Sequence, residues 1–270
     1  MQPRVTNLEQ RETRMSRGTA KPTSGTMETA IVVVQALAIA MVVRVFLYQP
    51  FNIPSGSMKE TLLIGDYLFV SKLSYGYSKF SFPFGLDLFK GRIFAAEPKR
   101  GDVAVFKLPR DNSTDYIKRV IGLPGDEISV RHSVLYINGR EVPREDAGYF
   151  ETREDGGGVL KIKAYTETLP NGVKYHVLDR TPDGQLDNVG PYIVPAGHYF
   201  MMGDNRDNST DSRVARDQGG VGFVPFENFV GRADLIFFSA AVDDPEAFKL
   251  WKPWSWPFDI RWNRFFTVVR

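Results

Sequence analysis

The sequence predicts a mainly β protein: one N-terminal transmembrane helix followed by an antiparallel-sheet domain. Three observations lead to this prediction. One apolar run near the N-terminus has membrane length, short β-branched and aromatic segments follow it, and Gly, Pro, Asn and Asp separate those segments. No long amphipathic helical pattern competes with the strands, apart from a short turn that could begin at Ser57. The 270 residues suffice for one large domain or two modest ones.

The N-terminal part predicts a tail and a membrane span. Residues 1–27 are polar, contain five basic residues and are expected to form a disordered tail. We assign residues 28–48 to a transmembrane helix, because the apolar run 30–48 would reach roughly 28 Å, close to the bilayer core of about 30 Å. The basic residues precede the span, so the tail should be cytoplasmic and residues 49–270 should lie outside.

The apolar run has two other interpretations. A buried helix of a soluble protein has similar composition, and a cleavable signal peptide also begins with a charged segment. A signal peptide usually ends in small residues, whereas this run ends in the bulky residues Phe46, Leu47 and Tyr48. An uncleaved anchor is therefore the preferred interpretation.

After the span, six segments have the composition of short strands: 67–70, 103–106, 116–121, 127–130, 134–137 and 198–202. Asn138-Gly139 is a signal for a tight hairpin turn that would pair the fifth segment with the residues after Arg140. Residues 138–194 are richer in Gly, Asp and Glu than their surroundings. We expect this stretch to be a small β subdomain inserted in the domain 49–270.

The composition argues against several kinds of site. Without cysteine there can be no disulfide, thiolate zinc site or cysteine nucleophile. The three histidines stand alone, so a metal site is not expected, and although a Ser-His-Asp triad stays compatible with the composition, no histidine lies in a motif. The net charge of +2 comes with no basic stripe, so nucleic acid is not expected as a partner. No cofactor is expected.

Ser57 is the first candidate for chemistry. A serine hydroxyl is a poor nucleophile unless a base removes its proton during attack. Gly56 lets the backbone approach a substrate closely, and Pro54 stiffens the entry to the segment. On local grounds alone, however, Pro-Ser-Gly-Ser is more simply an ordinary turn.

Lys118 is the candidate base. It lies in the apolar predicted strand 116–121, where burial would lower its pKa from about 10.4 toward the working pH. On a strand it would share a face with Tyr116, while Arg119 points the other way. Local sequence alone favours an exposed strand lysine. Lys59 is closer to Ser57 in the chain, but residues two apart do not face one another on a helix, so Lys59 is expected to be solvated.

Residues 203–213 form a dense polar loop. A calcium-binding EF-hand loop starting at Asp207 would need Gly at its sixth position and Glu at its twelfth, where this chain has Ser212 and Gln218. That kind of calcium loop is excluded, and an Asx-rich turn is the simplest local interpretation.

Taken together and in this order, the segments 51–58, 116–126 and 203–213 resemble bacterial type I signal peptidases. These are membrane-bound serine proteases that remove signal peptides from exported proteins, and the resemblance covers most of residues 51–213. It implies that Ser57 is the nucleophile and Lys118 the general base. One departure is visible: many members of the family have proline where this chain has Glu60.

The resemblance also implies supporting and substrate-binding residues. Ser55 would help the Ser57 N–H stabilise the oxyanion, Ser209 would hydrogen-bond the base, Asp211 and Arg213 would form a structural ion pair, and Asp204 with Arg119 a second one. Shallow apolar pockets would admit small side chains at −3 and −1 of the substrate. Their expected lining is Phe51, Ile53, Met58, Leu62, Tyr116 and Ile117.

The partners and location implied are those of the family: secretory preproteins as substrates, a bacterial inner membrane, a cytoplasmic N-terminus, a periplasmic catalytic domain and a monomeric state. All four tryptophans lie within residues 251–262, together with Lys and Arg, a composition typical of a membrane interface. The aromatic stretch 75–94 could also contact lipid. Packing of these tryptophans in the core is the alternative.

Two rival functions remain open on the sequence. A catalytically silent, membrane-anchored β domain would bind partners without needing Ser57 or Lys118. A self-cleaving Ser-Lys protein related to the SOS-response repressors would use the same chemistry, but the N-terminal span and the lack of a DNA-binding helix pair argue against it.

Overall fold

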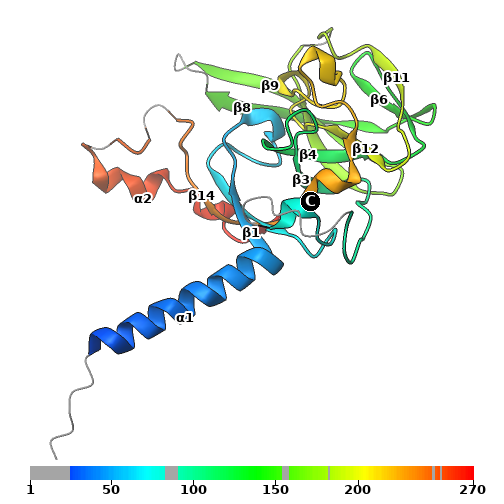
Figure 1. Ribbon diagram of the computed structural model, residues 1–270. Helices are drawn as coiled ribbons and strands as arrows, with labels where there is room; N and C mark the ends of the chain where they lie inside the picture. Colours follow the sequence, from blue (N-terminus) through cyan, green and yellow to red (C-terminus); the bar gives the residue numbers. More distant parts are fainter. Residues whose placement is uncertain (1–24, 83–90, 154–157, 182, 245–246, 250) are drawn as a thin grey trace, which may run out of the picture. The chain divides into compact units, whose positions relative to one another are not determined.

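The computed structural model describes residues 25–82, 91–153, 158–181, 183–244, 247–249 and 251–270. The chain divides into two units, Met1–Met41 and Val42–Arg270. Helix α1, Gly25–Phe46, contains the one segment among the described residues that is long and apolar enough to cross a membrane, Met27–Phe46, with a mean hydropathy of 2.3 (Figure 1). Residues 1–24 of the expected tail lie outside the described residues.

The helix ends two residues before the predicted boundary. Strand β1, Tyr48–Asn52, already begins where the span was expected to end, so Tyr48 belongs to the sheet. Pro50 explains the difference: proline cannot donate a backbone hydrogen bond to a helix, and it disfavours helical conformation in the residue before it.

One large antiparallel sheet organises the second unit. Its strand order is β1-β2-β14-β3-β4-β12-β13, and β15 pairs with β14. The remaining strands have the bounds β2 Asp66–Ser71, β3 Val103–Lys107, β4 Asp115–Gly122, β12 His198–Met202, β13 Val224–Pro225, β14 Phe229–Ser239 and β15 Thr267–Val268. The long strand β14 pairs with β2 on one side and with β3 on the other, so it connects the first two strands to the rest of the sheet.

Two smaller sheets cover the middle of the chain. The first has the order β10-β9-β8, with β8 Arg144–Arg153, β9 Val159–Thr168 and β10 Lys174–Asp179, and its long β8–β9 hairpin is prominent in Figure 1. The second has the order β11-β5-β6-β7, with β5 Glu127–Arg131, β6 Val134–Ile137, β7 Arg140–Glu141 and β11 Val189–Ile193. Asn138 and Gly139 make the expected turn, with φ of 54° and 73°.

The predicted fold class, mainly antiparallel β, is confirmed, and all six predicted strand segments are strands. The three-stranded sheet lies wholly within the predicted insertion 138–194. Strand β11, however, pairs with β5, which precedes that stretch, so the second sheet is built from both sides of the predicted boundary. The domain limits therefore stay a prediction.

Short helical turns connect the strands: η1 Gly56–Met58, η2 Lys79–Ser81, η4 Arg206–Asn208, η5 Arg216–Gln218, η6 Phe226–Asn228, η7 Pro253–Ser255, α2 Trp256–Asp259 and η8 Trp262–Arg264. The hydrophobic core divides into clusters, of which the one beneath η1 is the most relevant for the site. It contains Met58 and Leu62, both fully buried, with Leu68 and Val70 of β2. Burying side chains of this size contributes roughly 1.5–3 kcal/mol each, so η1 is anchored to the sheet.

The C-terminal tryptophans lie on the surface. Trp251, Trp254, Trp256 and Trp262 are all exposed, as is Phe258 between them. The alternative that these rings pack in the core is therefore wrong for the described residues. Of the aromatic stretch 75–94, Tyr75 is buried and Phe94 exposed, and residues 83–90 lie outside the described residues.

Candidate active site

Ser57 sits in the middle of turn η1 and is nearly buried. The next residue, Met58, anchors the turn in the core, while Asn205 holds its backbone from the other side. The Asn205 N–H donates to the Ser57 carbonyl (3.1 Å), and its side-chain amide donates to the Gly56 carbonyl (2.9 Å). Asn205 is itself buried, so these bonds fix the position of the serine. Sequence reasoning gave Asn205 no role.

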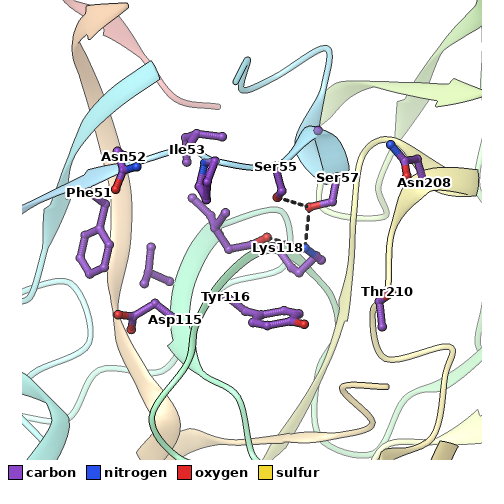
Figure 2. Close-up of a pocket in the computed structure, with 14 residues that line it drawn as sticks. Phe51, Asn52, Ile53, Ser55, Ser57, Asp115, Tyr116, Lys118, Asn208 and Thr210 are labelled. Atoms are coloured by element: carbon purple, nitrogen blue, oxygen red, sulfur yellow. Dashed lines mark hydrogen bonds between the residues drawn. The ribbon is translucent and has the colours of Figure 1, made fainter. Parts of the chain in front are cut away.

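Lys118 meets Ser57 across the sheet. Its Nζ donates to the Ser57 Oγ (2.7 Å) and to the Ile117 carbonyl (2.9 Å), and it lies 5.3 Å from the centre of the Tyr116 ring. Figure 2 shows the serine and lysine side chains pointing toward one another. The lysine is 3% exposed because β4 is buried along most of its length, including both faces. The two residues are thus brought together from positions 61 apart in the chain.

Burial lowers the pKa of Lys118 from 10.5 to about 8, although the negative charges of Asp211 and Asp204 oppose the shift. At pH 7 roughly 10% of a lysine with this pKa is neutral, compared with about 0.03% of an unperturbed one. A neutral amine can accept a proton, whereas an ammonium cannot. The geometry and the pKa together make Lys118 competent to act as a base toward the serine hydroxyl.

A cleft of about 500 Å³ opens beside the Ser57–Lys118 pair. Phe51, Ile53, Tyr116 and Ile117, four of the residues predicted to contact substrate, line it. In Figure 2, Phe51 and Asp115 lie on one side of the pair and Asn208 and Thr210 on the other. The wall near Phe51 therefore combines apolar side chains with the Asp115 carboxylate, and the wall near the 203–213 loop is polar.

Met58 and Leu62 are a correction to the predicted pocket. Neither lines the cleft, and both are fully buried in the cluster under η1. Their side chains point into the sheet because the turn must be anchored, so they support the site from below.

The serines expected to assist catalysis are close to the pair but make different contacts. The Ser55 Oγ lies 3.5 Å from the Ser57 Oγ (Figure 2). Ser209 is buried, but no hydrogen bond joins its Oγ to Lys118 within the described residues. The roles predicted for both hydroxyls stay predictions.

Both expected ion pairs are present. Arg213 lies 2.9 Å from Asp211, and Arg119 lies 2.7 Å from Asp204; all four side chains are buried. Burial alone would raise the pKa of Asp211, but the Arg213 guanidinium and the Gly203 N–H, which donates to the Asp211 Oδ2, together lower it. The carboxylate therefore stays charged and keeps the loop tied together.

Three residues of a buried polar network were missed by the sequence reasoning. Glu167 of β9 binds Arg206 of η4 through both carboxylate oxygens (2.9 and 2.5 Å), and the Tyr175 hydroxyl of β10 donates to Glu167 (2.6 Å). The Arg206 carbonyl in turn accepts a hydrogen bond from Arg213. The network links the small sheet to the active-site loop, and no local pattern marked its members.

Lys59 is a second correction. It was expected to be solvated, but its Nζ donates to the Thr152 Oγ1 (3.1 Å) and lies 3.7 Å from the Asp243 carboxylate. Glu60 follows in a turn with a φ of 87°, closed by a hydrogen bond from the Thr61 N–H to the Met58 carbonyl. Proline is locked near −65°, so the proline common at this position in the family does not fit this turn.

Known proteins are similar to this chain in sequence. The profile of the family described as "Signal peptidase, peptidase S26" matches residues 26–238. A signal peptidase I of Rickettsia typhi is 48% identical over 214 residues, which cover 76% of this chain and 78% of that protein. A signal peptidase I of Rickettsia canadensis is 44% identical over 245 residues, with 85% and 88% covered.

Among solved structures, a signal peptidase I from Enterococcus faecalis is 28% identical and covers 51% of this chain and 97% of that one, with a TM-score of 0.29, which is too low to compare the folds. The profile match extends over most of the chain, from the apolar helix to the end of β14, and includes both Ser57 and Lys118. The chain belongs to the signal peptidase, peptidase S26 family.

Proposed function

We propose that this signal peptidase cuts preproteins with a Ser57–Lys118 dyad, through an acyl-enzyme. The observation that carries the proposal is the 2.7 Å hydrogen bond between the Lys118 Nζ and the Ser57 Oγ, at the edge of a cleft. The depressed pKa of this buried lysine supports it further. No histidine among the described residues lines the cleft, and of the titratable groups Asp115, Tyr116 and Lys118 that line it, Lys118 is the one hydrogen-bonded to Ser57.

The reaction follows from these positions. Ser57 attacks the scissile carbonyl while the neutral Lys118 takes its proton. The tetrahedral oxyanion is stabilised by the Ser57 N–H and the Ser55 hydroxyl, each such donor typically contributing about 3–4 kcal/mol in the transition state. Lys118 then protonates the leaving amine, the mature protein departs, and Lys118 activates a water that hydrolyses the Ser57 ester and releases the signal peptide.

The cleft suggests why small residues would be preferred next to the cut. Phe51, Ile53, Tyr116 and Ile117 form a rigid apolar wall, and each is held by the sheet or by the core. Such walls accept alanine and exclude large side chains by steric conflict. We therefore assign an Ala-x-Ala preference at −3 and −1.

We further propose that the enzyme is a monomer of the bacterial inner membrane, anchored by α1, with a cytoplasmic tail and a periplasmic catalytic domain 49–270. The exposed tryptophans 251–262, together with Lys252, Arg261 and Arg264, have the composition of a surface resting on the outer leaflet. Brominated lipids should quench their fluorescence; absence of quenching would contradict this contact.

Cleavage of a purified secretory preprotein tests the proposed function. The detergent-solubilised chain, its Ser57→Ala variant and a control with the exposed Ser113 changed to alanine would be compared, with the new N-terminus sequenced. We expect a cut after Ala-x-Ala by the wild type and Ser113→Ala only. Binding without any cut would favour the silent module, and a cut by Ser57→Ala would refute the assigned nucleophile.

A further inference from the structure

A threonine outside the cleft connects the two segments that carry the proposed dyad. Ser57 lies in η1, whereas Lys118 lies in β4. Thr61 comes shortly after η1, and its Oγ1 accepts a hydrogen bond from the Arg119 Nη2 at 3.1 Å. Arg119 is the residue next to Lys118 in β4. A side-chain hydrogen bond therefore joins the serine turn to β4 directly beside the lysine.

The Thr61 hydroxyl also donates to a buried carboxylate of the 203–213 loop. Its Oγ1 lies 2.6 Å from the Asp204 Oδ2, and that oxygen accepts a second hydrogen bond from the Arg119 Nη2 at 2.7 Å. Arg119 and Asp204 are 0% and 1% exposed. Hydrogen bonds to charged groups in such surroundings are short and strong, because water does not compete for them. The three side chains form a closed triangle between the turn, β4 and the loop.

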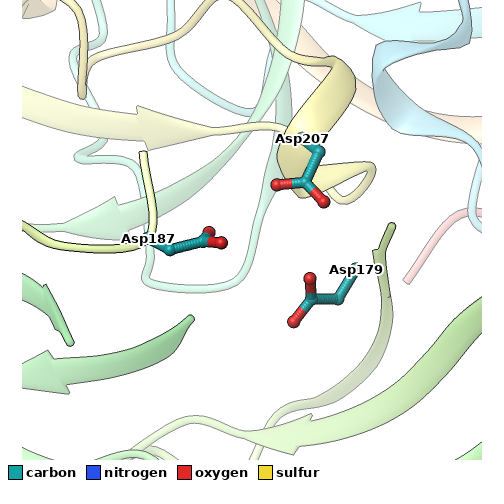
Figure 3. A group of neighbouring side chains, drawn as sticks. All are labelled: Asp179, Asp187 and Asp207. Atoms are coloured by element: carbon teal, nitrogen blue, oxygen red, sulfur yellow. The ribbon is translucent and has the colours of Figure 1, made fainter. Parts of the chain in front are cut away.

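Asp204 is itself held from the far side. Its backbone carbonyl accepts a hydrogen bond from the Leu178 N–H at 2.8 Å. Further along the loop, the Asp207 Oδ2 accepts the Arg180 N–H at 2.6 Å. Figure 3 shows the carboxylate of Asp207 close to that of Asp179, the last residue of β10. The loop is thus fixed to the end of β10, and Asp204 is a rigid partner for the threonine.

The backbone of Thr61 is held as well, so the direction of its hydroxyl is fixed. Its N–H donates to the Met58 carbonyl at 3.1 Å, within the turn that follows Ser57. Its carbonyl accepts a hydrogen bond from Arg264 at 3.0 Å, and that arginine also pairs with the buried Asp66 of β2 at 2.5 Å. Thr61 does not line the cleft. It can therefore influence the reaction only through the position of residues that do.

The turn around Ser57 is attached to the loop at two points. Asn205, the neighbour of Asp204, donates to the Ser57 carbonyl at 3.1 Å, and Thr61 bonds to Asp204 further along the turn. Between these attachments the Ser57 Oγ lies 2.7 Å from the Lys118 Nζ. A displacement of about 1 Å from the reacting geometry can lower a rate about 100-fold. Without the Thr61 hydroxyl, the turn loses the bond that ties its end to β4.

We propose that Thr61 is a positioning residue for the dyad: its hydroxyl, bonded to Asp204 and Arg119, holds the Ser57 turn at hydrogen-bonding distance from Lys118. This role presupposes that Ser57 and Lys118 carry out the cleavage. It requires the hydroxyl group of Thr61 and not its methyl group. Serine can make both bonds at this position, whereas valine has the same shape as threonine and can make neither.

Steady-state kinetics of the full detergent-solubilised chain on a fluorogenic peptide with an Ala-x-Ala site would test this role. Thr61→Val should lower kcat about 10- to 100-fold and change KM by less than about threefold, because the residue lies outside the cleft. Thr61→Ser should keep kcat within about threefold of the wild type. Thr114→Val is the matched control, since the Thr114 Oγ1 also donates to a carboxylate, that of Asp111, at 2.6 Å, but in an exposed turn. Its kcat should equal that of the wild type.

Circular dichroism separates positioning from folding. Each variant is assayed at a temperature at which it is fully folded, so a role of Thr61 in stability alone would leave kcat unchanged. Thr61→Ala also lacks the hydroxyl and should show the same loss of kcat. It replaces Thr61→Val if the valine variant does not fold.

A kcat of Thr61→Val and Thr61→Ala within about threefold of the wild type, with Ser57→Ala and Lys118→Met inactive, would overturn the proposal. It would also be overturned if Thr61→Ser lost as much activity as Thr61→Val, or if the loss appeared in KM rather than in kcat. Cleavage by Ser57→Ala or Lys118→Met would instead refute the dyad itself.

Discussion

Replacing Lys118 with methionine should abolish cleavage and at the same time stabilise the fold at neutral pH. The lysine is buried, and its pKa falls from 10.5 to about 8. At pH 7 the folded protein therefore holds a mostly charged ammonium where burial disfavours charge, whereas the unfolded chain solvates it. Methionine has a similar shape and no charge to bury.

The size of the effect follows from the pKa difference. A shift from 10.5 to about 8 corresponds to roughly 3 kcal/mol of stability lost by the wild type below pH 8. Losing the hydrogen bond to Ser57 costs the variant about 1 kcal/mol, which leaves a net gain of about 2 kcal/mol. For a protein of this size that is a rise in Tm of about 4–8 °C.

The pKa difference also fixes the direction in which the stability of the wild type changes with pH. Between pH 8 and 10.5 the unfolded chain binds the proton and the folded protein does not, so the stability of the wild type rises through this window. Methionine lacks this contribution, and the advantage of the variant should shrink from pH 8 to pH 10.5.

Thermal denaturation of both proteins at pH 7 to 10, followed by circular dichroism, would measure this. Lys161→Met, which changes an exposed lysine paired with Glu151, is the matched control and should bring no such gain. If Lys118→Met were less stable than the wild type at pH 7, with a gap independent of pH, the buried ammonium would not carry the cost assigned to it.

Three further predictions concern the surroundings of the site. Glu60→Gly should stabilise the fold by about 1 kcal/mol because its φ is 87°, and Glu60→Pro should destabilise it by about 3 kcal/mol or more; urea denaturation measures both. Glu167→Ala should cost about 3–5 kcal/mol in the same assay, since Arg206 loses its buried partner. Gly203→Ala should lower kcat/KM for a fluorogenic signal-peptide substrate at least tenfold, because its Cβ would clash with Ser209; unchanged kinetics would contradict the packing there.

Much of the fold could be predicted because its signals are local. Short β-branched or aromatic runs separated by Gly, Pro, Asn and Asp predicted strands such as 134–137 and 198–202 with their observed bounds. Strand β14 was missed although it is central to the large sheet. It contains Gly231, Arg232 and Asp234, which weaken the strand pattern, and its stability comes from pairing with β2 and β3, far away in the sequence.

The residues of the candidate active site likewise depend on contacts that the local sequence does not reveal. Neither Ser57 nor Lys118 stood out on local grounds, and only the resemblance to a family brought them together. The role of Asn205 in holding the turn around Ser57 could not be predicted, because it depends on contacts with residues about 148 positions earlier in the chain. Lys59 was assigned wrongly because its partners lie in two distant segments of the chain.

The central claim is that a lysine kept partly neutral by burial takes the proton of Ser57. Its most direct test is kcat/KM for a fluorogenic peptide with an Ala-x-Ala site, measured from pH 6 to 10. A base with a pKa of about 8 predicts a tenfold rise between pH 7 and 9 and a plateau above, in the wild type and not in Lys118→Met. A rate that keeps rising in proportion to hydroxide up to pH 10, or one that does not change with pH, would contradict it.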